Sequence, residues 1–264
     1  MRILMKKILM LILILSSLHS VLKAQQNKIK LVKISGNQVS DIRHVSKVVV
    51  PYLYKSAIDL SGEDVKEKKE AFIHLLLPSI LIAKRELAEK RKTVSEFLNI
   101  DRELTNEEMN YLELLKEEYK CNESKELLSK LHTHPTSIVL AQAAIESGWG
   151  TSRFYREANN LFGVWSYNKS EPRIRASEDR NGDTVYVKRY SSLSKSISSY
   201  FKILARGPYS TFRKEREKTK NVFILISYLK LYSERREAYV KSLEQMIRFN
   251  GLEQYDEYVL KQEK

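Results

Sequence analysis

The feature that most constrains the fold is the stretch Ala141-Gln-Ala-Ala-Ile-Glu-Ser-Gly-Trp-Gly-Thr-Ser-Arg-Phe154. Its first half consists of small and apolar residues with helical spacing, and Pro135 lies where a first helical turn accepts proline. Gly148 is typical of the end of a helix. The pattern predicts a helix from Pro135 to about Ser147 and a second short helix over Thr151–Ala158.

The composition favours helices in the rest of the chain. The 264 residues include only 8 Gly and 5 Pro, and 42% are hydrophobic. That hydrophobic share is ordinary for a globular protein and too high for a disordered chain. We therefore expect a mainly α (α+β) fold, with further helices over residues 62–120 and 194–204 and in two C-terminal stretches, 219–231 and 234–249.

Residues 62–120 are expected to form two to four helices. Ser61 is the expected N-cap of the first one, and Pro78 is expected to kink or interrupt it. Thr93-Val-Ser-Glu96 and Thr105-Asn-Glu-Glu108 both have the spacing of a capping box, which predicts a helix start at each.

Residues 166–192 have a different pattern. Val185-Tyr-Val-Lys-Arg-Tyr190 alternates, and Asn181-Gly-Asp183 is a turn sequence. Together they predict a β-hairpin with its turn near Asn181-Gly182. Near the other end of the chain, Val48-Val-Val50 predicts a short strand or extended segment.

Residues 1–24 have the pattern of a secretory signal peptide, with three cations ahead of the apolar run Ile8–Leu15. That run is short for a membrane-spanning helix, and a retained N-terminal anchor is the alternative. The formal charge of +13 would fall to +9 on cleavage after Ala24, because four cations and no acids are removed. A basic exported chain is attracted to anionic surfaces, and export makes nucleic acid the weakest of these partners. Membrane contact is expected only through the signal segment.

The reactive residues offer little support for a metal or thiol site. Cys121 is the only cysteine and cannot form an internal disulfide, so we interpret it as structural or incidental. His132-Thr-His-Pro135 contains a histidine pair, but no third ligand follows at useful spacing. We interpret this segment as the loop into the next helix and predict no metal or cofactor.

Glu146 is the candidate acid of the chain. It lies in the last turn of the helix predicted over residues 135–147, where the negative end of the helix dipole disfavours a carboxylate. The neighbouring Ile145 and Trp149 would add desolvation, and both effects raise a carboxyl pKa. A carboxyl group that stays protonated near neutral pH can act as a general acid. The alternative is a surface glutamate ahead of a glycine helix stop.

Residues 141–154 and Asn159-Asn-Leu-Phe-Gly163 together resemble the peptidoglycan glucosaminidase family, which has a lysozyme-like fold, and more closely its Bax-type members. The resemblance continues through Arg189–Ser192 and Ser196–Tyr200, and it closes with Tyr232–Val240 and Met246–Asn250. One departure lies within Tyr232–Val240, where Arg236 replaces the glycine usual in Bax-type proteins.

The resemblance extends over roughly residues 65–255 and implies a division of the chain. The expected parts are a signal peptide (1–24), a partly extended lead-in (25–61), a helical N-terminal region (62–130), a glucosaminidase catalytic domain (131–255) and a tail (256–264).

The family implies cleavage of the β-1,4 bond after N-acetylglucosamine, with Glu146 as the general acid. A second carboxylate is expected in the hairpin, where Glu178 is the best positional match. The alternatives there are Asp179, Asp183 and Glu171. The acetamido group of the substrate can also replace a second carboxylate, and the sequence leaves inversion and substrate assistance open.

A tyrosine that positions the acetamido group matches Tyr232 best, with Tyr239 as the alternative. The expected substrate-binding residues are Trp149, Asn160, Phe162, Tyr190 and Tyr239. The predicted function is thus an exported endo-β-N-acetylglucosaminidase, associated with the cell wall in the periplasm or outside the cell. Its glycan cleavage would be independent of amidase activity. The alternatives are a lytic transglycosylase and a non-catalytic cell-wall-binding protein.

Overall fold

The computed structural model describes residues 29–177, 179 and 183–262. The signal peptide predicted for residues 1–24 therefore lies outside the described residues. Within them the protein is mainly helical with a few short strands, which confirms the mainly α prediction. No helix in the described part of the chain combines the length and the apolar character needed to cross a membrane.

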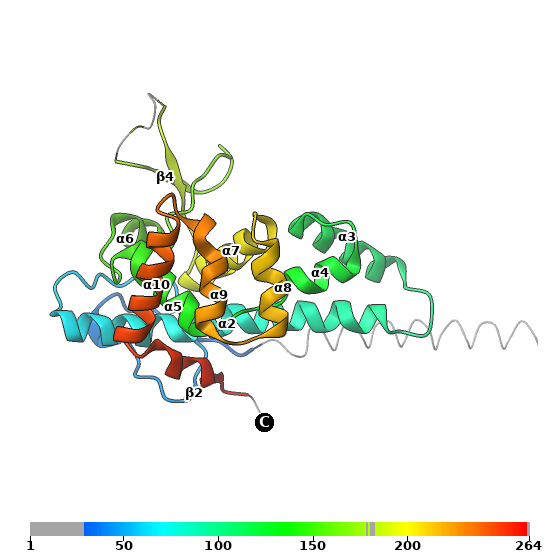
Figure 1. Ribbon diagram of the computed structural model, residues 1–264. Helices are drawn as coiled ribbons and strands as arrows, with labels where there is room; N and C mark the ends of the chain where they lie inside the picture. Colours follow the sequence, from blue (N-terminus) through cyan, green and yellow to red (C-terminus); the bar gives the residue numbers. More distant parts are fainter. Residues whose placement is uncertain (1–28, 178, 180–182, 263–264) are drawn as a thin grey trace, which may run out of the picture.

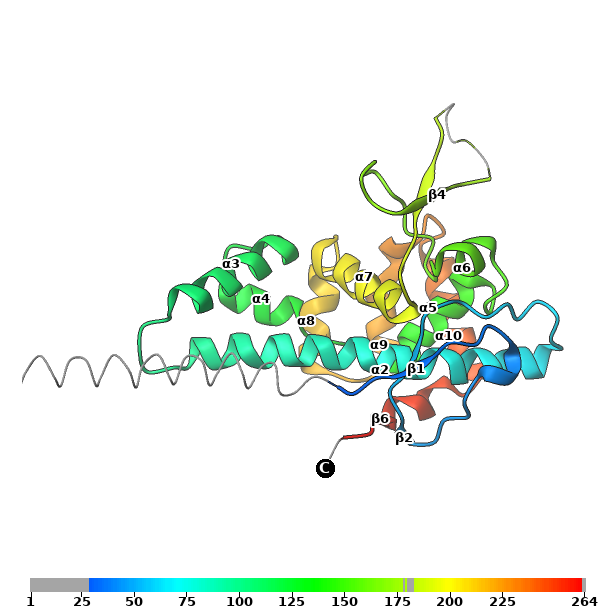
Figure 2. The same cartoon turned by 180° about the vertical axis from the view of Figure 1, so that it is seen from behind.

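The helix α2 (Val65–Leu98) runs the length of the molecule in Figures 1 and 2, with most of the other helices on one side of it. The prediction that Ser61 caps it is wrong. The cap is Asp64, whose side chain accepts hydrogen bonds from the backbone N–H groups of Lys66 and Glu67. Asp64 is better placed because its carboxylate lies within one turn of those free donors.

Pro78 was predicted to kink or interrupt this helix, and the interruption is wrong, because α2 continues through Pro78. Proline removes only one backbone hydrogen bond here, and all residues over 75–83 are buried, so packing on both sides of Pro78 holds the helix together. The capping box predicted at Thr93–Glu96 is wrong for a related reason. Those residues form the last turns of α2, and Val94 is fully buried.

The second predicted capping box is confirmed. Thr105 caps α3 (Asn106–Tyr119): its Oγ1 accepts from the Glu108 N–H, and the Glu108 carboxylate accepts from the Thr105 N–H. Arg102 adds a bidentate pair to Glu108 with both N–O distances at 2.7 Å. Residues 62–120 thus contain two helices, within the predicted range.

The helix α5 (Thr136–Ser147) lies in the core beside α2, and its residues 136–144 are all buried. The turn into α5 and its end at Gly148 match the prediction. The other elements of this half are α4 (Ser124–Lys130), α6 (Arg153–Ala158), α7 (Leu193–Arg206), α8 (Ser210–Lys218), α9 (Val222–Ile226), η2 (Ser227–Tyr232), α10 (Glu237–Phe249) and η3 (Leu252–Glu257).

The strands form three small pairs. The predicted hairpin is confirmed as β4 (Arg173–Arg175) antiparallel to β5 (Tyr186–Lys188). Its predicted turn residues, Asn181 and Gly182, lie outside the described residues. The hairpin projects from the helical body in Figure 1. The other pairs are parallel: β1 (Val32–Ile34) with β3 (Tyr52–Tyr54), and β2 (Val48–Val49) with β6 (Val259–Leu260). The short 3-10 helix η1 (Val39–Asp41) lies between β1 and β2.

One hydrophobic core joins helices from both sides of residue 131, because its buried members run from Tyr54 to Leu252. A second, small cluster lies on the opposite side of α2, where Val45, Val49, Leu77 and Leu81 pack against Tyr258 and Leu260. The N-terminal helices therefore support the central helix α5 directly, through the same core.

Candidate active site

The candidate site begins where α5 ends. Three consecutive residues have positive φ: Gly148 (58°), Trp149 (57°) and Gly150 (78°). This left-handed turn ends α5 after Ser147 and leads into α6, which Ser152 caps. A side chain at Gly150 would meet Leu60 and Phe72 at 3.1 Å. Glycine is therefore needed at Gly150 for its backbone angle and for the close packing of α2.

Trp149 fills the space beside the start of α2. Its ring packs edge-on against Phe72 at a centroid distance of 5.4 Å, and the Lys69 ammonium lies 5.2 Å from the ring centroid. The ring is half-buried. A role for Trp149 in substrate binding stays a prediction. In the structure its ring also packs against α2.

Glu146 lies in the last turn of α5 and is half-buried. Its Oε1 accepts a hydrogen bond from the Tyr239 hydroxyl at 3.0 Å. Burial raises the pKa of Glu146, and this effect outweighs the opposing influences of the Tyr239 hydrogen bond and the nearby Arg235. Glu146 forms no ion pair within the described part of the chain. A carboxyl group in this setting holds its proton to higher pH than an exposed glutamate does.

A continuous chain of buried hydrogen bonds ends at Glu146. Gln142 Nε2 donates to the Tyr239 hydroxyl (2.9 Å), and Gln142 Oε1 accepts from the Tyr200 hydroxyl (2.6 Å). The Tyr200 oxygen lies 2.8 Å from His134 Nε2. All four of these side chains are buried. The chain links the loop before α5 with α5, α7 and α10, so three helices and one loop position Glu146.

Tyr232 supports this chain from the end of η2. Its ring stacks on Tyr239 at a centroid distance of 5.7 Å and an interplanar angle of 13°, and it meets Tyr200 edge-on at 6.2 Å. Of the two tyrosines proposed for the acetamido role, Tyr239 has its hydroxyl on Glu146, and Tyr232 lies against the Tyr239 ring.

The other predicted binding residues all have partners inside the protein. Asn160 is buried, and its amide bonds the backbone of Val164 and Lys188. Phe162 stacks on Tyr200 at 4.4 Å, and the Tyr190 hydroxyl bonds Ser199 Oγ at 2.9 Å. These contacts fasten the turn 159–163 and the segment after β5 to the body, and a direct role in substrate binding stays a prediction.

The second carboxylate is expected in the hairpin. Its first candidate, Glu178, lies outside the described residues. Glu171 accepts from Lys188 Nζ (2.8 Å) and Ser166 Oγ (2.7 Å). Burial would raise the Glu171 pKa, but these hydrogen bonds outweigh it and the pKa is lowered. Asp179 pairs with Arg175, whereas Asp183 lines a hollow of about 500 Å³ beside Trp165 and Tyr186.

Arg236, the departure from the family pattern, has φ 50° and ψ −115° at the start of α10. This conformation is costly for any residue with a Cβ and easy for glycine. The conformation observed at Arg236 is therefore strained for an arginine, whereas the glycine usual at this position in Bax-type proteins would adopt it without strain.

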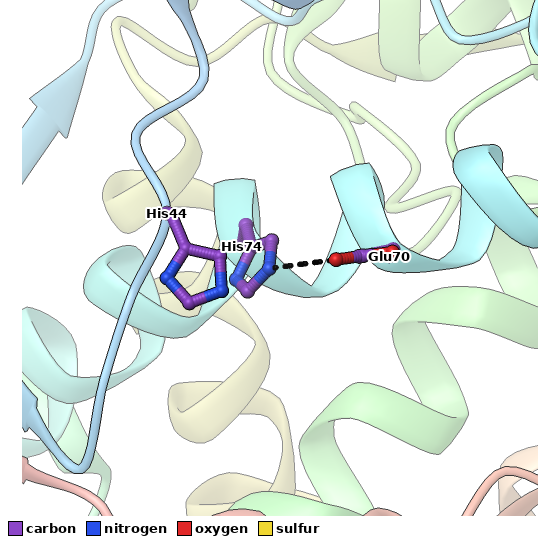
Figure 3. A group of neighbouring side chains, drawn as sticks. All are labelled: His44, Glu70 and His74. Atoms are coloured by element: carbon purple, nitrogen blue, oxygen red, sulfur yellow. Dashed lines mark ion pairs between the residues drawn. The ribbon is translucent and has the colours of Figure 1, made fainter.

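One cluster could be considered for a metal ion: His44, Glu70 and His74 place one ligand atom each within 4.8 Å of one another (Figure 3). His74 Nδ1 accepts from the Val45 N–H, so the proton of the neutral ring is on Nε2, which faces Glu70 at 3.6 Å. A metal would need that Nε2 lone pair. The contacts fit an anchor between the segment before β2 and α2 better than a preformed metal site.

The buried chain was not predicted from the sequence, although one of its members gave a signal. Gln142 is a polar residue on an otherwise apolar helix face with Ile138, Ala141 and Ile145. Burial of that face requires hydrogen-bond partners for the amide. Its partners Tyr200 and Tyr239 are 58 and 97 residues away in the chain, so no local pattern identifies them.

Fold and site together define a mainly helical protein with one half-buried carboxyl group at a helix end and a β-hairpin beyond it. Residues 121–252, half of the chain, match the family described as mannosyl-glycoprotein endo-beta-N-acetylglucosaminidase. The chain belongs to this glucosaminidase family.

Two curated relatives and one solved structure illustrate the similarity. Protein bax of Escherichia coli (strain K12) is 34% identical over 120 residues, which cover 43% of this chain and 42% of that protein. Peptidoglycan hydrolase FlgJ of the same strain is 38% identical over 96 residues, covering 31% of this chain and 30% of that protein. The match thus spans less than half the length of either relative.

The catalytic domain of the autolysin Auto from Listeria monocytogenes is a structural neighbour at 21% identity. The similarity covers 62% of this chain and 96% of that domain, with a TM-score of 0.41.

Proposed function

We propose that this chain is an exported glycoside hydrolase that cleaves the β-1,4 bond after N-acetylglucosamine in peptidoglycan or a related glycan. The observation that carries the proposal is Glu146, a half-buried carboxyl group with a raised pKa at the end of α5. Membership of the glucosaminidase family and the name of the relative FlgJ, a peptidoglycan hydrolase, support the reaction and the substrate. The net charge of +9 that is expected on cleavage after Ala24 would attract the chain to an anionic cell-wall polymer.

In the proposed reaction the Glu146 carboxyl donates its proton to the glycosidic oxygen as the bond from that oxygen to the anomeric carbon breaks. The leaving sugar takes the proton as its hydroxyl hydrogen, and Glu146 becomes a carboxylate. The Tyr239 hydroxyl already donates to this carboxyl group and stabilises the charge that develops on it. Proton transfer of this kind requires no metal or cofactor.

Water then attacks the anomeric carbon with help from a second group, for which we propose the hairpin acid Glu178. Asp183 is the first alternative, because Glu171 and Asp179 are already engaged by Lys188 and Arg175. Assistance from the substrate acetamido group is the other alternative, and Tyr232 and Tyr239 are the proposed residues near it. We propose the periplasm or the cell exterior as the location, with the cell wall as the partner.

The test is digestion of purified peptidoglycan sacculi by the wild type and by Glu146→Gln. The variant keeps the shape and removes the proton donor, so we expect release of soluble fragments to fall by at least 10²–10³-fold. Glu157→Gln is the matched control, because Glu157 is an exposed glutamate of α6 that pairs with Arg153. It should release fragments at the wild-type rate. Undiminished release by Glu146→Gln would reject the proposal.

Mass spectrometry of the same products identifies the reaction. A reducing N-acetylglucosamine end supports the hydrolase. A 1,6-anhydro end would instead identify a lytic transglycosylase. Binding to sacculi without any soluble product from the wild type would point to a cell-wall-binding protein.

A further inference from the structure

The hydroxyl of Tyr239 has two partners, and their chemistry decides where its proton lies. Gln142 Nε2 can only donate, so the Tyr239 oxygen accepts from it at 2.9 Å. The hydroxyl proton is then available for Glu146 Oε1 at 3.0 Å. This arrangement holds only as long as the Gln142 amide keeps its NH₂ group towards Tyr239.

The orientation of the Gln142 amide is set on its other side. Its Oε1 accepts from the Tyr200 hydroxyl at 2.6 Å, and the Tyr200 oxygen lies 2.8 Å from His134 Nε2. If the amide turned over, Tyr200 would have to accept from its NH₂ group and donate to His134 Nε2. The neutral His134 ring would then carry its proton on Nδ1.

That alternative is disfavoured by the surroundings of His134. Its Nδ1 is buried and has no hydrogen-bond partner among the described residues. An orphaned N–H in the interior is rarer and costlier than an unused lone pair. Burial, reinforced by Arg216, Lys84 and His132, lowers the His134 pKa well below its usual range and keeps the ring neutral. The proton of His134 therefore belongs on Nε2, where it points to Tyr200.

We propose that His134, Tyr200 and Gln142 are positioning residues that form a one-way hydrogen-bond relay, which keeps the hydroxyl proton of Tyr239 on Glu146. Every donor in the relay points towards Glu146, from the loop before α5 through α7, α5 and α10. His134, Tyr200 and Gln142 act on the acid only through Tyr239. The role of the relay in catalysis rests on the proposed function, whereas its effect on the pKa of Glu146 does not.

The relay stabilises the charged form of Glu146. It opposes the burial of the carboxyl group, and it becomes stronger when the proton has left for the substrate, because hydrogen bonds to a carboxylate exceed those to a neutral acid. The other groups that act on Glu146 are Arg235, just before α10, which favours the carboxylate, and Tyr232 at the end of η2, whose own pKa is raised chiefly by burial. Loss of the relay should therefore raise the pKa of Glu146.

The test is a direct titration of Glu146 by NMR with ¹³C-labelled glutamate carboxyl groups. The signal of Glu146 is the one missing from Glu146→Gln. Tyr239→Phe should raise the Glu146 pKa by about one unit, and Tyr200→Phe should raise it by about half a unit, since each weakens the hydrogen bond to the carboxylate. The double variant should match Tyr239→Phe alone, because Tyr200 acts only through Tyr239.

Tyr54→Phe is the matched control, because Tyr54 is another buried tyrosine whose hydroxyl accepts from the Arg43 N–H, away from the relay. It should leave the titration of Glu146 unchanged. A Tyr200→Phe titration that overlays the wild type, or a double variant that shifts beyond Tyr239→Phe, would overturn the relay. The titration uses no substrate, so a failure of the relay and a failure of the proposed hydrolase activity are separate results.

Discussion

The interior around α5 and the nearby hairpin differ in how their polar side chains are held. Around α5, Gln142, Tyr200 and Tyr239 are buried, and each is held by hydrogen bonds to residues of other elements. In and beside the hairpin, two of the described acids are held by nearby cations: Glu171 pairs with Lys188, and Asp179 pairs with Arg175. The interior thus fixes one acid with a raised pKa, whereas Glu171 beside the hairpin is paired with a cation and has a lowered pKa. General acid chemistry needs the first kind, and activation of water by a base can use the second.

The largest loss of stability is expected from Gly150→Ala, in the turn that follows α5. The added methyl group would meet Leu60, Phe72 and Tyr155 at 3.1–3.3 Å, and the backbone angle of 78° disfavours any side chain. We expect the free energy of unfolding to fall by about 2–4 kcal/mol. Chemical denaturation measures it.

Gly62→Ala is the control for that change, because a Cβ there would meet nothing within 4 Å and its φ is not in the left-handed range. Its effect should stay within about 0.5 kcal/mol. Equal effects of the two alanines would show that the turn after α5 is not tightly packed.

Glu146→Gln tests the raised pKa through stability. A folded state that raises the pKa of Glu146 binds its proton more tightly than the unfolded chain, so the wild type loses stability as the pH rises through the Glu146 titration. The glutamine variant lacks this loss. Above the titration it should be more stable than the wild type, by an amount on the order of 1 kcal/mol or less.

The same advantage should vanish well below pH 4.5, the ordinary value for glutamate, where the wild-type carboxyl is protonated in both states. Denaturation at a series of pH values measures the difference. A pH-independent difference between the two proteins would contradict a raised pKa for Glu146.

The turn before α10 is a second place where a substitution should stabilise the protein. Arg236→Gly should stabilise the protein by up to about 1 kcal/mol, because glycine adopts the observed φ of 50° without strain. The neighbouring Arg235→Gly has no such strain to relieve and should be neutral or destabilising. Denaturation of both variants separates them, and a loss of stability in Arg236→Gly would mean that the arginine side chain makes up for its strain.

The smallest effect is expected in the hairpin. Asp179→Asn removes the ion pair with Arg175, in which both side chains are largely exposed. Such pairs contribute little, so we expect a change of less than about 0.5 kcal/mol, reduced further by added salt. A larger loss would remove the contrast between the hairpin and the interior.

Capping residues, proline and glycine predicted some helix starts and ends correctly, but the predictions failed where burial in the core keeps a helix intact. The helix over residues 136–147 and the capping box at Thr105 were predicted, because Pro135, Gly148 and Glu108 act on their immediate neighbours. Pro78 and Thr93 carry the same kind of local signal but lie in α2, where packing against the core keeps the helix intact.

The site divides in the same way. Glu146 was predicted because its position at a helix end is visible in the sequence. The partners of Gln142 come from α7 and α10, so they depend on tertiary packing that no local pattern encodes. The packing of η2 against α10 likewise decides that Tyr239 donates the hydrogen bond to the acid and that Tyr232 stacks on the Tyr239 ring.

The most direct test of the central claim is the pH dependence of sacculus hydrolysis by the wild type and by Tyr239→Phe. If protonated Glu146 is the acid, the rate should fall at high pH with an apparent pKa above 4.5, the ordinary glutamate value. In Tyr239→Phe the maximal rate should be lower and this fall should move to higher pH, because the carboxylate loses its donor. A fall that stays at the same pH in both proteins would show that the ionising group is not the one to which Tyr239 donates, and would contradict the account.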